Sequence, residues 1–164
     1  MRHLTITAIA TFMLDQATKL GVVHGLDLYN RGVIEVVPPL LTFRMAWNYG
    51  INFGLFANSA DIMRWVLIAV ALAISTWVWV WIRREGAAWR VQIAGGLLIG
   101  GALGNVVDRI VYGAVADFLN MSCCGIENPY AFNLADVAIF AGAIGLILFS
   151  GSGNAGARAT RKTP

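Results

Sequence analysis

Charged side chains are scarce in this sequence of 164 residues, where Asp, Glu, Lys and Arg together make up 13% and hydrophobic residues make up 58%. Soluble domains typically carry about 25% charged residues. The chain therefore has too few charges to cover a surface exposed to water. Low charge also excludes a disordered chain, which combines weak hydrophobicity with strong net charge. We expect a compact membrane protein.

Cysteine and histidine are equally scarce, with two of each in the chain. The cysteines are adjacent, at Cys123 and Cys124, and cannot build a disulfide framework. Two histidines do not supply a credible set of zinc ligands. The basic residues occur singly or in pairs, so none of them forms a run that could follow a phosphate backbone. The sequence predicts no metal site, no cofactor and no nucleic-acid partner.

Four apolar segments are candidates for membrane-spanning helices. Residues 64–82 and 91–109 contain uncharged runs of 18 and 17 residues. An 18-residue helix is about 27 Å long, close to the roughly 30 Å of a bilayer's hydrocarbon core. Residues 4–23 are apolar apart from one acid and one lysine, and residues 131–149 are apolar apart from one acid. The sequence predicts an α-helical polytopic membrane protein with four spans in a single domain, residues 1–150.

The distribution of basic residues predicts the orientation in the membrane. With four spans both termini lie on the same side. That side holds seven of the twelve basic residues: Arg2, Arg83, Arg84, Arg90, Arg158, Arg161 and Lys162. The positive-inside rule then places both termini in the cytoplasm. Residues 151–164 are small, polar and basic, which predicts a disordered cytoplasmic tail.

The segment between the first two spans, about residues 24–62, predicts a small platform on the outer membrane surface. Its VIEVVPPLLTFRMAWN stretch mixes β-branched and aromatic residues around Pro38 and Pro39, which predicts two short strands. The NYGINFGLFANS stretch that follows is rich in Gly and Asn, and it predicts a turn leading into a short amphipathic helix. Between spans three and four, residues 114–119 are a candidate strand in an otherwise irregular segment.

Acidic residues at the ends of the spans are the candidate functional groups. A carboxylate inside a bilayer is costly unless it is paired or hydrated, so such residues are functional candidates. Four acids fall at or near the predicted outer ends of spans, which places them in one layer: Asp15, Asp108, Asp117 and Asp136.

Supporting interactions are predicted around these acids. Asp15 and Lys19 stand four residues apart on one helix face, the spacing of a structural ion pair. Arg109 is predicted either to form a salt bridge or to bind a ligand. Three glycines at four-residue spacing allow another helix to approach closely, and their face leads to Asn105 and Asp108: Gly96, Gly100 and Gly104.

Asp117 and Asp136 are candidates for a catalytic pair. The apolar neighbours of Asp117 are expected to raise its carboxyl pKa, and Asn133 shares a helix face with Asp136. Two adjacent carboxyls share one proton, which is the working state of an aspartic hydrolase. Pattern alone leaves three alternatives open: structural polar residues, a non-catalytic membrane assembly factor, and a small proton-relay or transport protein using Asp15, Asp117 and Asp136.

Five motifs stand in order along the chain: DQATK from Asp15, NYGINFGLF from Asn48, GGALGNVVDR from Gly100, GAVADF from Gly113 and FNLAD from Phe132. In order and spacing they resemble those of the lipoprotein signal peptidases (signal peptidase II), membrane aspartic peptidases of the bacterial inner membrane. Together they extend over nearly the whole chain. One departure is Asn52, where the family usually has Ala, and it affects the expected shape of the local pocket.

The resemblance implies a fold of four transmembrane helices with a small periplasmic β-platform and a short amphipathic helix. It implies that Asp117 and Asp136 are catalytic, at the periplasmic face, without metal or cofactor. Nine further residues are implied to bind substrate or support the pair: Asn48, Gly50, Asn105, Arg109, Asn133, Asp15, Lys19, Asp108 and Gly104. The implied substrates are prolipoproteins whose Cys carries a diacylglyceryl group, cleaved just before that Cys. We expect a monomer that contacts membrane lipids.

Overall fold

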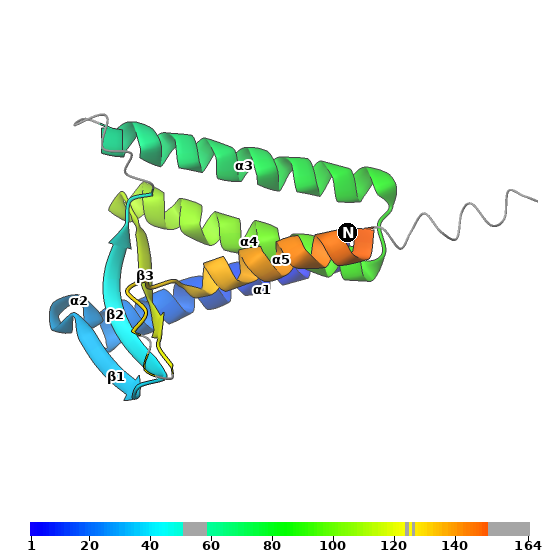
Figure 1. Ribbon diagram of the computed structural model, residues 1–164. Helices are drawn as coiled ribbons and strands as arrows, with labels where there is room; N and C mark the ends of the chain where they lie inside the picture. The colour runs from blue at the N-terminus through cyan, green and yellow to red at the C-terminus, as the bar shows by residue number, and fades with distance from the viewer. Residues whose placement is uncertain (51–58, 124, 126, 151–164) are drawn as a thin grey trace, which may run out of the picture.

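Four long helices run side by side in the computed structural model, which describes residues 1–50, 59–123, 125 and 127–150 (Figure 1). They are α1 (Arg2–Lys19), α3 (Ser59–Glu85), α4 (Trp89–Tyr112) and α5 (Leu134–Ser150). A π-helical segment, Leu20–Gly25, continues α1. All four segments predicted from their apolar character are confirmed as helices, with ends shifted by a few residues. α5 begins at Leu134 because Phe132 pairs with a strand instead.

Three of these helices are long and apolar enough to cross a membrane by length and composition: Arg2–Gly25, Asp61–Glu85 and Trp89–Tyr112. α5 is a shorter apolar helix of 17 residues. The part of the chain that the structure describes is therefore mostly helical, with three candidate spans and a small sheet.

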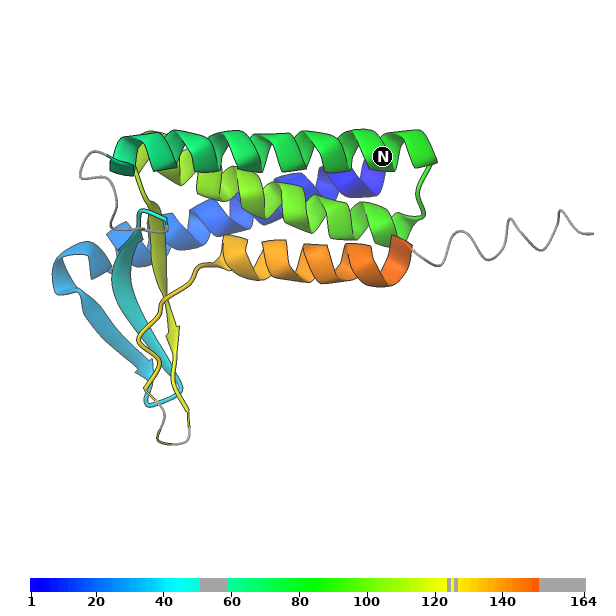
Figure 2. The same cartoon turned by 45° about the horizontal axis from the view of Figure 1, so that its top comes forward.

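α4 is the central helix, in contact with α1, α3 and α5 (Figure 2). Its glycines make the close approach to α1 possible, as their spacing predicts. A Cβ atom on Gly96 would lie 2.7 Å from the carbonyl oxygen of Leu4, and one on Gly100 would lie 2.8 Å from Cβ of Thr11. This contact between α1 and α4 sets the height of Asp15 on α1 relative to Gly104 on α4.

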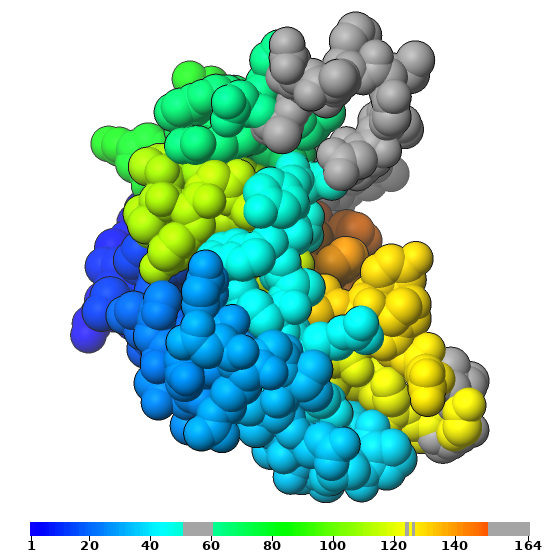
Figure 3. Space-filling model, turned by 90° about the vertical axis from the view of Figure 1, so that its left-hand side faces the viewer, coloured from blue at the N-terminus to red at the C-terminus, as the bar shows by residue number. Residues whose placement is uncertain are grey.

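A three-stranded antiparallel sheet lies at one end of the helices, in the order β1 (Val33–Val37), β2 (Leu41–Asn48) and β3 (Val115–Met121). The two strands predicted around the prolines are confirmed, as is the strand predicted near residues 114–119. Figure 3 faces this end, where β2 in cyan lies between the blue segment leading into β1 and the yellow segment that follows β3.

The sheet packs on the end of α1 through a small hydrophobic core of its own. Val23 of the π-helical segment and Leu28 are buried against Ala116 and Phe118 of β3. Leu28 belongs to a one-turn helix, α2 (Leu28–Arg31), which the sequence did not predict. The amphipathic helix expected after Asn48, and Asn52 within it, lie outside the described residues. The sheet thus holds β3, and Asp117 with it, against the helix ends.

Candidate active site

Asp117 on β3 and Asp136 in the first turn of α5 meet at one residue, Asn133. The side-chain Nδ2 of Asn133 donates to Oδ1 of Asp117 at 2.6 Å, and its backbone N–H donates to Oδ2 of Asp136 at 3.1 Å. Oδ1 of Asn133 accepts in turn from the backbone N–H of Asp136 at 3.0 Å. Asn133 is fully buried and Asp117 is 3% exposed. The structure therefore brings the two acids, Asp117 buried and Asp136 half-buried, to one polar site, which we call the carboxyl pair.

Each carboxyl of the pair accepts a second hydrogen bond from another asparagine. Asn48, the last residue of β2, donates to Oδ2 of Asp117 at 3.0 Å. Asn105 of α4 donates to Oδ1 of Asp136 at 2.9 Å, and its own Oδ1 accepts from Asn133 at 3.2 Å. All four oxygens of the carboxyl pair are therefore held in place by asparagine groups from three parts of the fold.

The pKa of Asp117 is raised from its ordinary value of 3.8 to about 6. Burial is the largest cause, since it penalises the charged carboxylate, and the negative charge of Asp136 is the second. Hydrogen bonds from Asn48 and Asn133 and the positive charge of Lys19 act in the opposite direction. The raised pKa agrees with the apolar sequence around Asp117, and it lets this carboxyl gain or lose a proton near neutral pH.

A buried charged cluster lies next to the carboxyl pair. Nζ of Lys19 is 2.8 Å from Oδ2 of Asp15 and 2.7 Å from Oδ2 of Asp108, and it donates to Oδ1 of Asn105 at 3.3 Å. The ion pair predicted between Asp15 and Lys19 is confirmed. Asn105 contacts both groups, so the four acids singled out in the sequence form one continuous polar network.

Gln16 also belongs to this network, although only its place in the DQATK motif singles it out in the sequence. Its Nε2 lies 3.1 Å from Oδ2 of Asp15 and 3.1 Å from Oδ1 of Asp108. The same group lies 3.4 Å from the carbonyl oxygen of Gly104. Gln16 therefore links α1 to α4 at the level of the buried charges.

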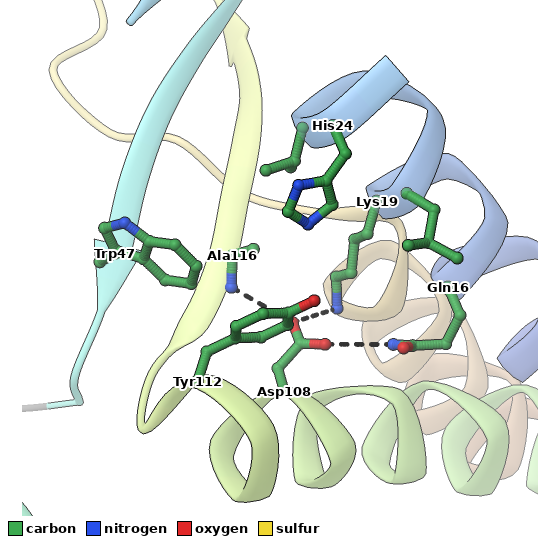
Figure 4. Close-up of a pocket in the computed structure, with 9 residues that line it drawn as sticks. Gln16, Lys19, His24, Trp47, Asp108, Tyr112 and Ala116 are labelled. Carbon is green, nitrogen blue, oxygen red and sulfur yellow. Dashed lines mark hydrogen bonds and ion pairs between the residues drawn. The ribbon is translucent and has the colours of Figure 1, made fainter. Parts of the chain in front are cut away.

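A small cavity of about 70 Å³ borders the charged cluster (Figure 4). Gln16, Lys19 and Asp108 line one side, and Trp47 and Tyr112, whose rings are 5.6 Å apart, line another. This volume fits a few water molecules at most. The cavity is too small for a peptide.

Arg109, Gly50 and Gly104, the remaining residues predicted for the site, each lie beside one of the polar groups described above. Nη1 of Arg109 donates to the carbonyl oxygen of Asn105 at 3.2 Å, and the described residues offer it no carboxylate within 4.0 Å. Gly50 has a φ of +93°, and its N–H donates to Oδ1 of Asn48 at 2.9 Å. A Cβ atom on Gly104 would overlap Oδ2 of Asp15. Gly50 thus supports Asn48, and Gly104 makes room for the carboxylate of Asp15.

The part of the chain that the structure describes contains no group of three or more His, Cys, Asp or Glu residues arranged to hold a metal ion. The polar groups at the carboxyl pair are carboxyls, which can give or take a proton, and amides, which orient the carboxyls by hydrogen bonding. This arrangement is suited to acid and base catalysis by two carboxyls.

Comparison with known proteins identifies the family. Residues 7–151 match the family model described as signal peptidase (SPase) II. The chain belongs to the signal peptidase II family. A lipoprotein signal peptidase of Methylorubrum extorquens is 44% identical over 145 residues, covering 88% of this chain and 83% of that protein. One of Rhodopseudomonas palustris is 37% identical, covering 87% of each chain.

Solved structures support the same assignment. Two structures, both described as a bacterial membrane enzyme, superpose with TM-scores of 0.72 and 0.70 at 26% identity. Each match covers 88% of this chain, and 90% and 85% of the respective solved chains. As a member of the signal peptidase II family, the chain is a peptidase and a membrane protein, and the resemblance carried by its five motifs is confirmed.

Proposed function

We propose that this chain is an aspartic endopeptidase that removes the signal peptide from prolipoproteins bearing a diacylglyceryl group, by cleaving the bond before the lipid-modified Cys. The observation that carries the proposal is the bridging of Asp117 and Asp136 by Asn133. The negative charge of Asp136 also raises the pKa of Asp117, so the two carboxyls influence each other's ionisation, as in the pair of an aspartic hydrolase. Relatives named lipoprotein signal peptidase support the substrate class.

In the proposed mechanism, Asp136 is the base and Asp117 is the acid. Asp136 takes a proton from a water molecule, whose oxygen attacks the scissile carbonyl carbon. Protonated Asp117 donates to the carbonyl oxygen as negative charge develops there. As the C–N bond of the tetrahedral intermediate breaks, Asp136 gives the proton it took from water to the leaving nitrogen of the lipid-modified Cys. Asp117 recovers its proton from the hydroxyl as the carbonyl forms again, which restores both carboxyls to their starting state. The raised pKa of Asp117, about 6, is the reason for giving it the acidic role.

The asparagines and Arg109 complete the proposed site. Asn48, Asn105 and Asn133 fix the orientation of the carboxyl pair through hydrogen bonds of 2.6–3.1 Å. Arg109 has no carboxylate within 4.0 Å among the described residues, and its Nη1 donates to the carbonyl oxygen of Asn105. We assign the other guanidinium donors to a backbone carbonyl of the substrate. No metal or cofactor takes part, since the carboxyls activate the water.

The proposed topology has four spans in one domain of residues 1–150, with both termini in the cytoplasm and the sheet in the periplasm. α5 is the fourth span, since 17 helical residues extend about 26 Å and the hydrocarbon core is roughly 30 Å thick. The carboxyl pair then lies at the periplasmic boundary of the inner membrane. A substrate anchored by its acyl chains presents the cleaved bond at that depth, to a monomer surrounded by lipid.

A proton relay through Asp15 is not favoured. Oδ1 of Asp15 accepts from the backbone N–H of Ala135 at 3.0 Å, and Oδ2 is paired with Lys19. The fully buried carboxylate is thus engaged on both oxygens.

The test uses Asp117→Asn and Asp136→Asn, each purified in lipid and given a precursor that carries the diacylglyceryl group. We expect each variant to cleave at least about 100-fold more slowly than the unchanged protein, the size of a lost acid or base. Asp61→Asn is the matched control, since its side chain is 89% exposed. Full cleavage by either active-site variant would overturn the catalytic assignment. If the unchanged protein fails to cleave the precursor, the proposed substrate class is wrong.

A further inference from the structure

The charged cluster is connected to the backbone that carries each acid of the carboxyl pair. On one side, Oδ2 of Asp108 accepts from the backbone N–H of Ala116 at 3.2 Å (Figure 4). Ala116 directly precedes Asp117 on β3. The same oxygen of Asp108 is 2.7 Å from Nζ of Lys19. The position of β3 at Asp117 is therefore tied to Lys19 through one carboxylate.

Asp15 makes the equivalent connection to the backbone next to Asp136. Oδ1 of Asp15 accepts from the backbone N–H of Ala135 at 3.0 Å. Ala135 directly precedes Asp136 at the start of α5. Oδ2 of Asp15 is 2.8 Å from Nζ of Lys19. The start of α5 is thus tied to the same ammonium group as β3.

Lys19 has three N–H donors, and each has an acceptor. Two donate to the carboxylates of Asp15 and Asp108, and the third donates to Oδ1 of Asn105 at 3.3 Å. Asn105 itself donates to Asp136. Lys19 is 6% exposed, while Asp15 and Asp108 are at most 1% exposed. Ionic groups so deeply buried require complete pairing, and removing one partner of such a group is strongly unfavourable.

We propose that Lys19 is a positioning residue that sets the separation and orientation of Asp117 and Asp136, by holding the two carboxylates that bind the backbone N–H before each of them. We call Lys19, Asp15 and Asp108 the clamp. The proposal rests on the proposed function, because it assigns the clamp to the geometry of that reaction. A bridge through one ammonium group explains why a buried charge cluster lies beside the carboxyl pair without being part of it.

Two substitutions disturb the clamp in different ways. Lys19→Met removes the ammonium group and keeps an unbranched side chain of similar length. Gly104→Ala keeps every charge, but its Cβ would overlap Oδ2 of Asp15 and displace that carboxylate. Gly21→Ala is the matched control for the glycine substitution, because a Cβ there has nothing within 4 Å.

We expect Lys19→Met and Gly104→Ala to lower kcat for cleavage of the lipid-modified precursor by about 10- to 100-fold, the effect of displacing reacting groups by about 1 Å. KM should change less than about threefold, since Lys19, Asp15 and Asp108 are at most 6% exposed and offer a substrate little surface to bind. Gly21→Ala should have the kcat of the unchanged protein.

The pH profile separates positioning from simple loss of stability. The charges that act on Asp117 come from Asp136 on α5, Arg109 on α4 and Lys19 on α1. The charge of Lys19 favours the ionised form of Asp117, so its loss raises the pKa of that carboxyl. Lys19→Met should shift the pH profile of the residual activity to higher pH, whereas Gly104→Ala should leave its midpoint in place.

Hydrogen exchange provides a readout that is independent of cleavage. In Lys19→Met, peptides containing Ala116 and Ala135 should exchange faster, while peptides from α3 keep their protection and show that the protein is folded. The proposal is overturned if Lys19→Met keeps at least half of the normal kcat, or if its activity falls only in proportion to the folded fraction. If Lys19→Met does not fold, Gly104→Ala decides, and normal kcat in that variant overturns the proposal. Failure of the unchanged protein to cleave the precursor is a failure of the proposed function, and exchange at Ala116 and Ala135 still tests the clamp.

Discussion

The side-chain amide of Asn133 donates to Oδ1 of Asp117 across a distance of 2.6 Å, the shortest of the hydrogen bonds at the carboxyl pair. The backbone of the same asparagine holds Asp136. One residue therefore orients an acid on β3 and an acid on α5, which is the next element along the chain. Its replacement is the mildest way to disturb the pair without removing a carboxyl.

Asn133→Ala should lower kcat for cleavage of a lipid-modified precursor by about 10- to 100-fold, because Asp117 loses a donor and is free to turn away from Asp136. KM should be nearly unchanged. Steady-state kinetics on the purified protein measure both constants. Asn128→Ala is the comparison, because the Asn128 side chain accepts from the backbone N–H of Tyr130 at 3.0 Å and bonds to neither acid. Equal kcat in the two variants would contradict the role given to Asn133.

The pH dependence of cleavage follows from the pKa of Asp117, about 6. Since Asp117 acts in its protonated form in the proposed mechanism, kcat/KM should fall as pH rises through about 6. The hydrogen bond from Asn48 favours the ionised carboxylate and so lowers this pKa. Asn48→Ala should raise the pKa and move the fall in kcat/KM to higher pH. A profile that moves to lower pH would contradict the assignment.

Gly100→Ala tests the packing of α4 on α1. The added Cβ would lie 2.5 Å from the carbonyl oxygen of Ala8 and 2.8 Å from Cβ of Thr11, so the helices must separate. We expect a loss of about 1–3 kcal/mol in the free energy of unfolding, as for other overpacked sites. Thermal unfolding in detergent measures the change. Gly21→Ala should unfold at the same temperature as the unchanged protein. Equal stability of the Gly100→Ala and Gly21→Ala variants would contradict the packing argument.

The proposed topology predicts the location of the C-terminus. A green fluorescent protein fused after Ser150 should fluoresce, because that side is cytoplasmic, and an alkaline phosphatase fused at the same residue should be inactive. The opposite pair of results would reverse the orientation inferred from the basic residues. It would also place the sheet and the carboxyl pair in the cytoplasm.

Chelation should leave cleavage unchanged, because the proposed mechanism activates water with carboxyls alone. Activity measured before and after treatment with EDTA provides the check. Strong inhibition that zinc reverses would contradict the mechanism.

Local patterns predicted much of this structure. Apolar runs predicted the helices, because only an apolar surface can face lipid. The spacing of Asp15 and Lys19 predicted their ion pair, since residues four apart share a helix face. The spacing of the glycines on α4 likewise predicted a close contact with another helix, which the structure shows to be α1. Each of these features depends on residues within one helix.

The contacts that define the site could not be predicted in this way. The hydrogen bond from Asn48 to Asp117 joins residues on β2 and β3, and its existence depends on the register of Ala46 opposite Asp117 in the sheet. The bonds from the backbone of Ala116 and Ala135 depend on how the helices and the sheet pack. The identity of these residues as alanines does not predict the bonds, because the group that donates to the carboxylate is the backbone N–H, which nearly every residue has.

The most direct test of the carboxyl pair compares Asp117→Asn, Asp136→Asn and the double variant in cleavage of one lipid-modified precursor. Groups that act as a unit lose their contribution when either is removed. We predict that the double variant has the same residual rate as each single variant, within about threefold. Losses in the double variant equal to the product of the two single losses would show that Asp117 and Asp136 act independently, and would contradict the account.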